Sequence, residues 1–101
     1  MGGIALSRNN IPIRLTDERW LHITEEHCEL AGLRLEILET IENPSYVFEG
    51  NQKALMAVRK VEKEKYLVVV YKELNKDGFI ITAFITRKIQ ILKRRKQLWP
   101  N

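Results

Sequence analysis

Apolar residues are densest in two neighbouring stretches, residues 66–71 and 79–86. Both stretches are rich in β-branched and aromatic side chains, which are typical of β-strands. Asp77 and Gly78 directly precede the second stretch, and these residue types tolerate the backbone conformations that a tight hairpin turn requires. The pattern therefore predicts a β-hairpin with Asp77 and Gly78 as its turn.

The register of this hairpin follows from counting outward from the turn. A turn formed by these two residues pairs Val70 with Ile85 and Val69 with Thr86. The first resulting face is apolar and is expected to be buried: Val68, Val70, Ile81, Ala83 and Ile85. The second face mixes apolar side chains with hydroxyls and a carboxylate: Leu67, Val69, Tyr71, Glu73, Thr82, Phe84 and Thr86. A turn of odd length would reverse one strand relative to the other.

Two further strands are predicted at residues 45–49 and 54–61. The second of these precedes a charged loop of three residues, and counting across that loop gives the pairs Arg59–Leu67, Val58–Val68 and Met56–Val70. Met56 and Val58 then extend the apolar face. On the opposite face, the same count brings together one guanidinium and three hydroxyls: Arg59, Tyr71, Thr82 and Thr86.

Two amphipathic helices are predicted ahead of these strands. Thr16 is a suitable N-cap for the first, because its side-chain oxygen can accept a hydrogen bond from the first helical turn. This helix is expected to run to about Cys28. The second spans residues 33–42, carries a broad apolar stripe, and is stopped by the Asn-Pro pair that ends at Pro44.

The ends of the chain are less regular. Residues 1–10 show no periodicity and are predicted to be a flexible arm, followed by a single domain over residues 11–101. Residues 11–15 suggest a short edge strand, since Pro12 argues against a central one. Residues 88–96 are predicted to be helical, although their alternating isoleucines fit a strand equally well. The overall order, helices followed by an antiparallel sheet, indicates an α+β fold.

Charge is distributed unevenly along the chain. The 101 residues carry a formal net charge of +4. Residues 17–49 contain nine acidic and two basic side chains, whereas residues 50–101 contain thirteen basic and four acidic ones. A basic half on a small domain favours an anionic partner, with nucleic acid as the leading candidate.

The composition also indicates in which cellular compartment the protein is expected. No apolar run approaches the roughly 18 residues that span a bilayer, and the apolar stretch near the N-terminus is too short for a secretory signal peptide. The single cysteine, Cys28, excludes an internal disulfide. We therefore expect a cytoplasmic protein with no membrane association.

Few residues are candidates for chemistry. The chain has no phosphate-binding glycine loop, no paired Cys-x-x-Cys motifs and no His-Glu-x-x-His motif, so neither a metal nor another cofactor is predicted. His22 and His27 are five positions apart, which places them on different sides of a helix. Without a catalytic role, His27 would fill the contact between helix and sheet, and His22 would be solvated.

Two basic features allow alternative interpretations. Arg59, between apolar strand residues, needs either an anionic ligand or an internal carboxylate such as Glu73 or Glu26. The basic segment near the C-terminus is either a solvated helix surface or a contact surface for phosphates. Its side chains are Arg87, Lys88, Lys93, Arg94, Arg95 and Lys96.

Several short motifs resemble a known family. They are Arg19-Trp-Leu-His-Ile, His27-x-Glu-Leu, Asn43-Pro, Lys65-Tyr-Leu-Val-Val-Val-Tyr and Thr82-Ala. They resemble the small nuclease domains of phages and mobile elements that are grouped with barnase, EndoU, the tRNA-cleaving colicins and the RelE toxins. The similarity covers residues 13–99 and departs where Cys28 stands in place of a proline.

The resemblance implies two N-terminal helices packed on a four-stranded antiparallel sheet, and a metal-independent endoribonuclease acting on tRNA or mRNA. His22 or His27 would be the acid or base, with Arg59 and Arg87 as phosphate clamps. The remaining candidates would orient the phosphate by hydrogen bonds: Tyr71, Thr82 and Thr86. Many members are toxins or effectors, which implies an antitoxin or immunity protein as partner.

Two other hypotheses fit the same residues. A non-catalytic module could bind nucleic acid through the basic segment, with Arg59 paired internally. A structural protein of a mobile element could form a homodimer through the second hairpin face, using Leu55, Leu67, Val69 and Phe84.

Overall fold

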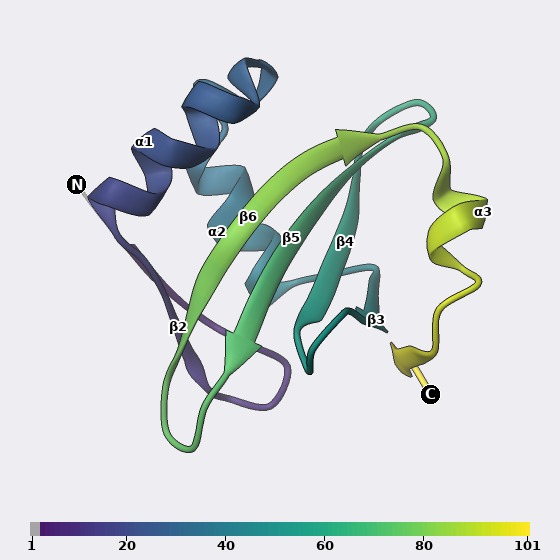
Figure 1. Ribbon diagram of the computed structural model, residues 1–101. Coiled ribbons are helices and arrows are strands. Elements are labelled where there is room, and N and C mark those ends of the chain that lie inside the picture. Colours follow the sequence, from purple (N-terminus) through teal and green to yellow (C-terminus); the bar gives the residue numbers. More distant parts are fainter. Residues whose placement is uncertain (1–2) are drawn as a thin grey trace.

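A single seven-stranded sheet, in the order β1-β2-β6-β5-β4-β3-β7, forms the centre of the protein in the computed structural model, which describes residues 3–101 (Figure 1). All neighbouring strands are antiparallel except β2 and β6, which are parallel. The strands are β1 (Gly3–Leu6), β2 (Pro12–Leu15), β3 (Tyr46–Glu49), β4 (Leu55–Glu62), β5 (Lys65–Glu73), β6 (Gly78–Thr86) and β7 (Gln97–Trp99). The helices are α1 (Asp17–Glu26), the 3-10 turn η1 (Cys28–Leu30), α2 (Arg34–Glu42) and the short α3 (Ile89–Leu92).

The α+β class is retained, but the predicted four-stranded antiparallel sheet is wrong. The N-terminal segment is not a loose arm, because Gly3–Leu6 pairs with β2 and places Ala5 in the core; residues 1 and 2 lie outside the described part. β2 is consequently an interior strand rather than an edge. At the opposite edge, Gln97–Trp99 pairs with β3. β1 and β7, of four and three residues, show no periodicity in the sequence that would mark them as strands.

The two N-terminal helices are confirmed in position. The Thr16 side chain accepts a hydrogen bond from the Arg19 N–H at 3.1 Å, as expected for an N-cap. The basic segment is helical only over Ile89–Leu92, so the helix predicted for residues 88–96 is confirmed in part.

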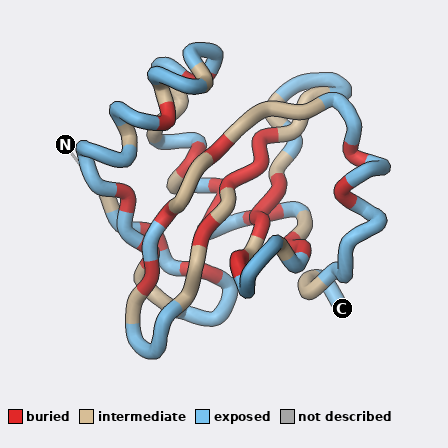
Figure 2. The backbone as a smooth tube through the Cα atoms, in the orientation of Figure 1, coloured by how far each residue is buried: buried red, intermediate tan, exposed pale blue. Residues whose placement is uncertain are grey.

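The central strands carry many buried residues, drawn red in Figure 2, and these form a cluster on each face of the sheet. The helix face lies under α1, η1 and α2, and its buried side chains include Leu67, Val69, Tyr71 and Ala83. The opposite face, here called the α3 face, is partly covered by Ile89 and Leu92 of α3, which pack on Phe48, Met56, Val58 and Val68. Apolar residues on both sides of β5 explain why its sequence reads as an unbroken run.

A β-bulge at Ile81 determines which residues of β6 lie on each face. Tyr71 pairs with Ile80 but Val70 pairs with Thr82, so Ile81 has no partner on β5. One extra residue reverses the facing of every side chain beyond it. Ala83 therefore turns to the helix face. The predicted pairs of Val70 with Ile85 and Val69 with Thr86 are wrong, because the turn ends before Gly78, which already pairs with Glu73, and the bulge changes the register again by one residue. The predicted pairing of β4 with β5 at Arg59–Leu67, Val58–Val68 and Met56–Val70 is confirmed.

Gly78 is not in the hairpin turn. The turn is closed by the Leu74 N–H, which donates to the Asp77 carbonyl at 2.7 Å, and Gly78 already pairs with Glu73 inside the sheet. A Cβ atom on Gly78 would lie 2.1 Å from the Lys72 carbonyl oxygen and 2.7 Å from Ile13 Cδ1. The glycine is thus needed for the close approach of β5, β6 and β2, and not for a turn conformation.

Gly78→Ala is expected to lower the free energy of unfolding by about 3 kcal/mol, because backbone atoms of β5 must move to admit the methyl group. Gly32→Ala is the matched control: Gly32 has a φ of +86° with no atom within 4 Å of the added Cβ, so only backbone strain of about 1 kcal/mol is added. Urea denaturation measures both. A loss for Gly78→Ala no larger than that for Gly32→Ala would contradict the close approach.

Candidate functional site

The bulge divides the cluster that the sequence predicted. Arg59 and Tyr71 lie on the helix face, because they pair with Leu67 and Leu55 respectively. Thr82 and Thr86 lie on the α3 face, where they pair with Val70 and Tyr66. The predicted surface shared by all four residues is therefore wrong.

Arg59 already has a carboxylate partner. Its Nη1 forms an ion pair with Glu39 Oε1 of α2, in place of the predicted alternatives Glu73 or Glu26. The pair lies in a cavity of about 510 Å³ between α2 and the β4–β5 hairpin. Other charged groups of both signs line this cavity: Glu29, Glu36, Glu62, Lys60 and Lys65. Such a mixed lining does not favour a polyanion, so the geometry argues against Arg59 as a phosphate clamp.

Tyr71 is inaccessible to a substrate. Its exposed fraction is 1%, and burial raises the pKa of its phenol far above the ordinary value, with a smaller contribution from the negative charge of Glu73. It borders a small cavity of about 210 Å³ at which the Arg8 guanidinium lies 4.2 Å from the centre of the Trp99 ring. Tyr71 thus belongs to the core rather than to a site.

His22 lies on the outer surface of α1. Its side chain is 54% exposed, and its Nε2 lies 3.4 Å from Glu26 Oε1 one helical turn later. His22 is therefore solvated, as expected for this histidine if it has no catalytic role. Its ion-pair partner within residues 3–101 thus belongs to α1 itself and not to the sheet.

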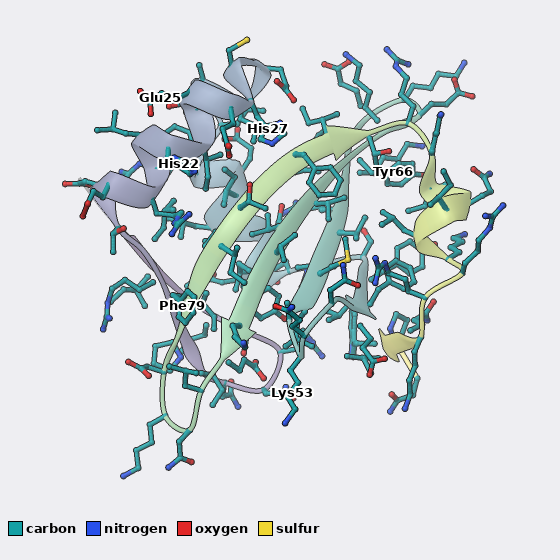
Figure 3. The ribbon with its side chains drawn as sticks, viewed as in Figure 1. His22, Glu25, His27, Lys53, Tyr66 and Phe79 are labelled. Carbon is teal, nitrogen blue, oxygen red and sulfur yellow. The ribbon has the colours of Figure 1, made fainter. Side chains whose placement is uncertain are left out.

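His27, in contrast, reaches β6. It ends α1, with its backbone N–H donating to the Ile23 carbonyl, and its ring is directed toward the upper half of β6 (Figure 3). The centres of the His27 and Phe84 rings are 6.4 Å apart, with an angle of 40° between the ring planes. Its Nδ1 lies 3.7 Å from Glu29 Oε2. Of the two histidines, His27 is the one that the fold brings into contact with a side chain of the α3 face, Phe84.

The part of the α3 face beside His27 is only half-buried. It consists of five side chains from β5 and β6, which we call the β5–β6 patch: Tyr66, Val70, Thr82, Phe84 and Thr86. Two aromatic rings and two further hydroxyls are therefore accessible on adjacent strands. Tyr66 and His27 lie on opposite sides of the upper half of β6 (Figure 3).

The basic segment begins where this patch ends. Thr86 Oγ1 accepts a hydrogen bond from the Lys88 N–H at 3.1 Å, which fixes the start of the segment against β6. Lys93 Nζ lies 5.2 Å from the centre of the Tyr46 ring, and Arg95 Nη1 lies 3.2 Å from Asn51 Oδ1. All six predicted side chains are exposed: Arg87, Lys88, Lys93, Arg94, Arg95 and Lys96. The patch is thus bordered by positive charge on the α3 side.

Sequence reasoning missed Tyr66 and Phe84 as site residues. Tyr66 lies five positions before Tyr71 on the same strand, so the alternation of side chains along a strand already placed it on the opposite face from Tyr71. Phe84 was placed on the wrong face because no residue type marks a bulge at Ile81.

The predicted dimer face is also wrong. Leu67 and Val69 are 0% exposed beneath the helices, and Phe84 lies on the other side of the sheet from them. These residues form no common accessible surface.

Within residues 3–101, no three His, Cys, Asp or Glu side chains are grouped so that they could bind a metal ion. None of the described helices has the length and apolar character needed to cross a bilayer. No family model, curated protein or solved structure matches the chain. Any functional assignment must therefore rest on the geometry of the site.

The contact between Arg59 and Glu39 predicts a measurable coupling. A double-mutant cycle with Arg59→Ala and Glu39→Ala should give roughly 0.2 to 1 kcal/mol, because both side chains are more than a third exposed and solvent screens the pair. The control cycle combines Arg59→Ala with Glu36→Ala, because Glu36 lines the same cavity without contacting Arg59. Equal coupling in the two cycles would contradict the specific ion pair.

The raised pKa of Tyr71 predicts that the free energy of unfolding decreases at alkaline pH. Since its pKa is raised in the folded state, the stabilisation is complete below the ordinary phenol pKa of about 10 and declines above it, as the unfolded chain ionises first. The slope contributed by one such group reaches at most about 1.4 kcal/mol per pH unit. Urea denaturation between pH 9 and 11 should show this component in the wild type and in Tyr66→Phe, but not in Tyr71→Phe. The same decline in Tyr71→Phe would assign it to other groups.

Proposed function

We propose that the protein is a metal-independent endoribonuclease whose active site is the β5–β6 patch, with His27 as its acid–base residue. The observation that carries this proposal is the position of His27 beside Phe84, at the edge of a surface that combines accessible aromatic rings, hydroxyls and an adjoining basic segment. The resemblance to the barnase, EndoU, colicin and RelE group supports the choice of reaction.

The patch suits single-stranded RNA. Aromatic rings that lie on a sheet can stack on unpaired bases, which duplex RNA does not expose. Exposed Arg87 and Lys88 directly follow Thr86 and can contact the phosphates. In this proposal Arg87 remains a phosphate clamp, while Arg59 and Tyr71 have no direct role.

The reaction follows from these groups. A base removes the proton of the ribose 2′-hydroxyl, whose oxygen attacks the adjacent phosphorus. The bond from phosphorus to the 5′-oxygen breaks, and an acid donates a proton to that oxygen. The products are a 2′,3′-cyclic phosphate and a 5′-hydroxyl end.

Two proton-transfer groups on opposite sides of the phosphate are needed for in-line attack. In this proposal His27 acts as one of them from beyond β6, and the Tyr66 hydroxyl on β5, across that strand, acts as the other (Figure 3). Thr82 and Thr86, which lie on the same face and pair with Val70 and Tyr66, can donate hydrogen bonds to the phosphate oxygens. The resemblance extends the proposal to a cytoplasmic toxin or phage-associated effector that is neutralised by a partner protein.

Incubation of the purified protein with total RNA or tRNA in the presence of a chelator should yield fragments with cyclic phosphate ends. His27→Ala is expected to lower the rate by a factor of about 10² to 10⁴, the usual contribution of an acid–base residue. His22→Ala is the matched control, since it removes the same residue type from α1, the helix that His27 caps, but away from the sheet. It should retain nearly full activity.

Three other results of these experiments would contradict the proposed nuclease site. Binding of RNA without turnover, with an affinity that falls steeply as salt is added, would favour the non-catalytic module. Cleavage that requires added Mg²⁺, or equal losses for His22→Ala and His27→Ala, would contradict the proposed site.

A further inference from the structure

We propose that Glu29 is a positioning residue that orients the imidazole of His27 and selects its tautomer. This inference rests on the proposed function, because it assigns a role relative to the proposed acid–base residue. It concerns a carboxylate that faces His27 and does not itself belong to the patch.

The local fold holds the two side chains together. η1 follows α1 directly, and the Leu30 N–H donates to the His27 carbonyl at 2.9 Å. Leu30 is fully buried and anchors the turn in the core, so Glu29 projects from a fixed backbone. Its Oε2 thereby lies 3.7 Å from His27 Nδ1.

The contact determines which imidazole nitrogen is free. A carboxylate facing Nδ1 favours the proton on that nitrogen and leaves the lone pair on Nε2, which is the arrangement a general base requires. The distance of 3.7 Å is longer than a hydrogen bond, and such contacts commonly shorten when substrate binds.

Glu29 has no competing ion pair among residues 3–101. It borders the charged cavity beneath α2, but the guanidinium of that cavity, Arg59, is paired with Glu39. Both members of the His27–Glu29 pair also keep accessible surface, at 34% and 48% of the side chain. The carboxylate is therefore available to the imidazole and can be replaced without disturbing the core.

The chain provides a matched control in the pair formed by His22 and Glu26, in which Nε2 and Oε1 are 3.4 Å apart. Glu29→Ala and Glu26→Ala each remove one exposed carboxylate beside one histidine. The test compares these two variants in the full chain.

The first measurement is the tautomer of His27, read from the ¹⁵N chemical shifts of its ring nitrogens over a pH series and compared in the neutral limit. We expect the Nδ1–H form to dominate in the wild type and in Glu26→Ala, and to lose its dominance in Glu29→Ala. This readout does not depend on cleavage. It therefore decides the role of Glu29 even if the protein proves not to be a nuclease.

The second measurement is steady-state cleavage of a short single-stranded RNA. Glu29→Ala should lower kcat about tenfold with KM within twofold, because the substrate-binding surface is unchanged while the imidazole is less often in the productive orientation. Glu26→Ala should leave both constants at the wild-type values. An unchanged His27 tautomer in Glu29→Ala, or a rise in KM with kcat unaltered, would overturn the positioning role.

Discussion

The bulge at Ile81 is the constraint on which the rest of the molecule depends. One face of the sheet is buried under the helices and the other is only partly covered, so each residue of β6 must match the layer that it meets. With the bulge, Ala83 enters the core beneath the helices and Phe84 meets the α3 face. Without it, hydroxyls would enter the fully buried layer and lose their contact with water, which is unfavourable for unpaired polar groups. One unpaired residue thus determines which side chains of β6 enter the core and which lie on the accessible surface.

The placement of His27 follows from the short pairing of β2 with β6. These strands pair only at Ile13–Gly78 and Arg14–Phe79. Beyond these pairs, no described strand lies on that side of β6, and the end of α1 with η1 packs there instead. A helix end at a strand edge can direct a side chain around the edge to the other face. This explains how an N-terminal histidine meets Phe84, whose strand neighbours belong to the second half of the chain.

Local patterns in the sequence predicted the helices, the N-cap at Thr16 and the register between β4 and β5, because each depends on neighbouring residues. The errors concern features without a local signal. Gly78 resembled a turn residue, although its role is to admit β2, a strand more than sixty positions earlier in the sequence. β1 and β7 are strands only because each finds an edge to pair with. For the candidate site, the basic segment and both threonines lie at the α3 face, whereas Arg59 stays on the helix face, because the bulge turned the threonines away from it.

The separation of charge between the two sides of the sheet also has a kinetic consequence. The helices α1 and α2, which are rich in acidic residues, lie on one side of the β4–β6 layer, and α3, which is flanked by basic residues, lies on the other (Figure 1). The molecule therefore carries a permanent dipole moment roughly perpendicular to its sheet. In the field of a polyanion, such a dipole experiences a torque that turns the α3 face forward before contact, within about 10 Å at 0.1 M salt. A net charge of only +4 would then understate the rate of productive encounters, because orientation rather than total charge selects the colliding face.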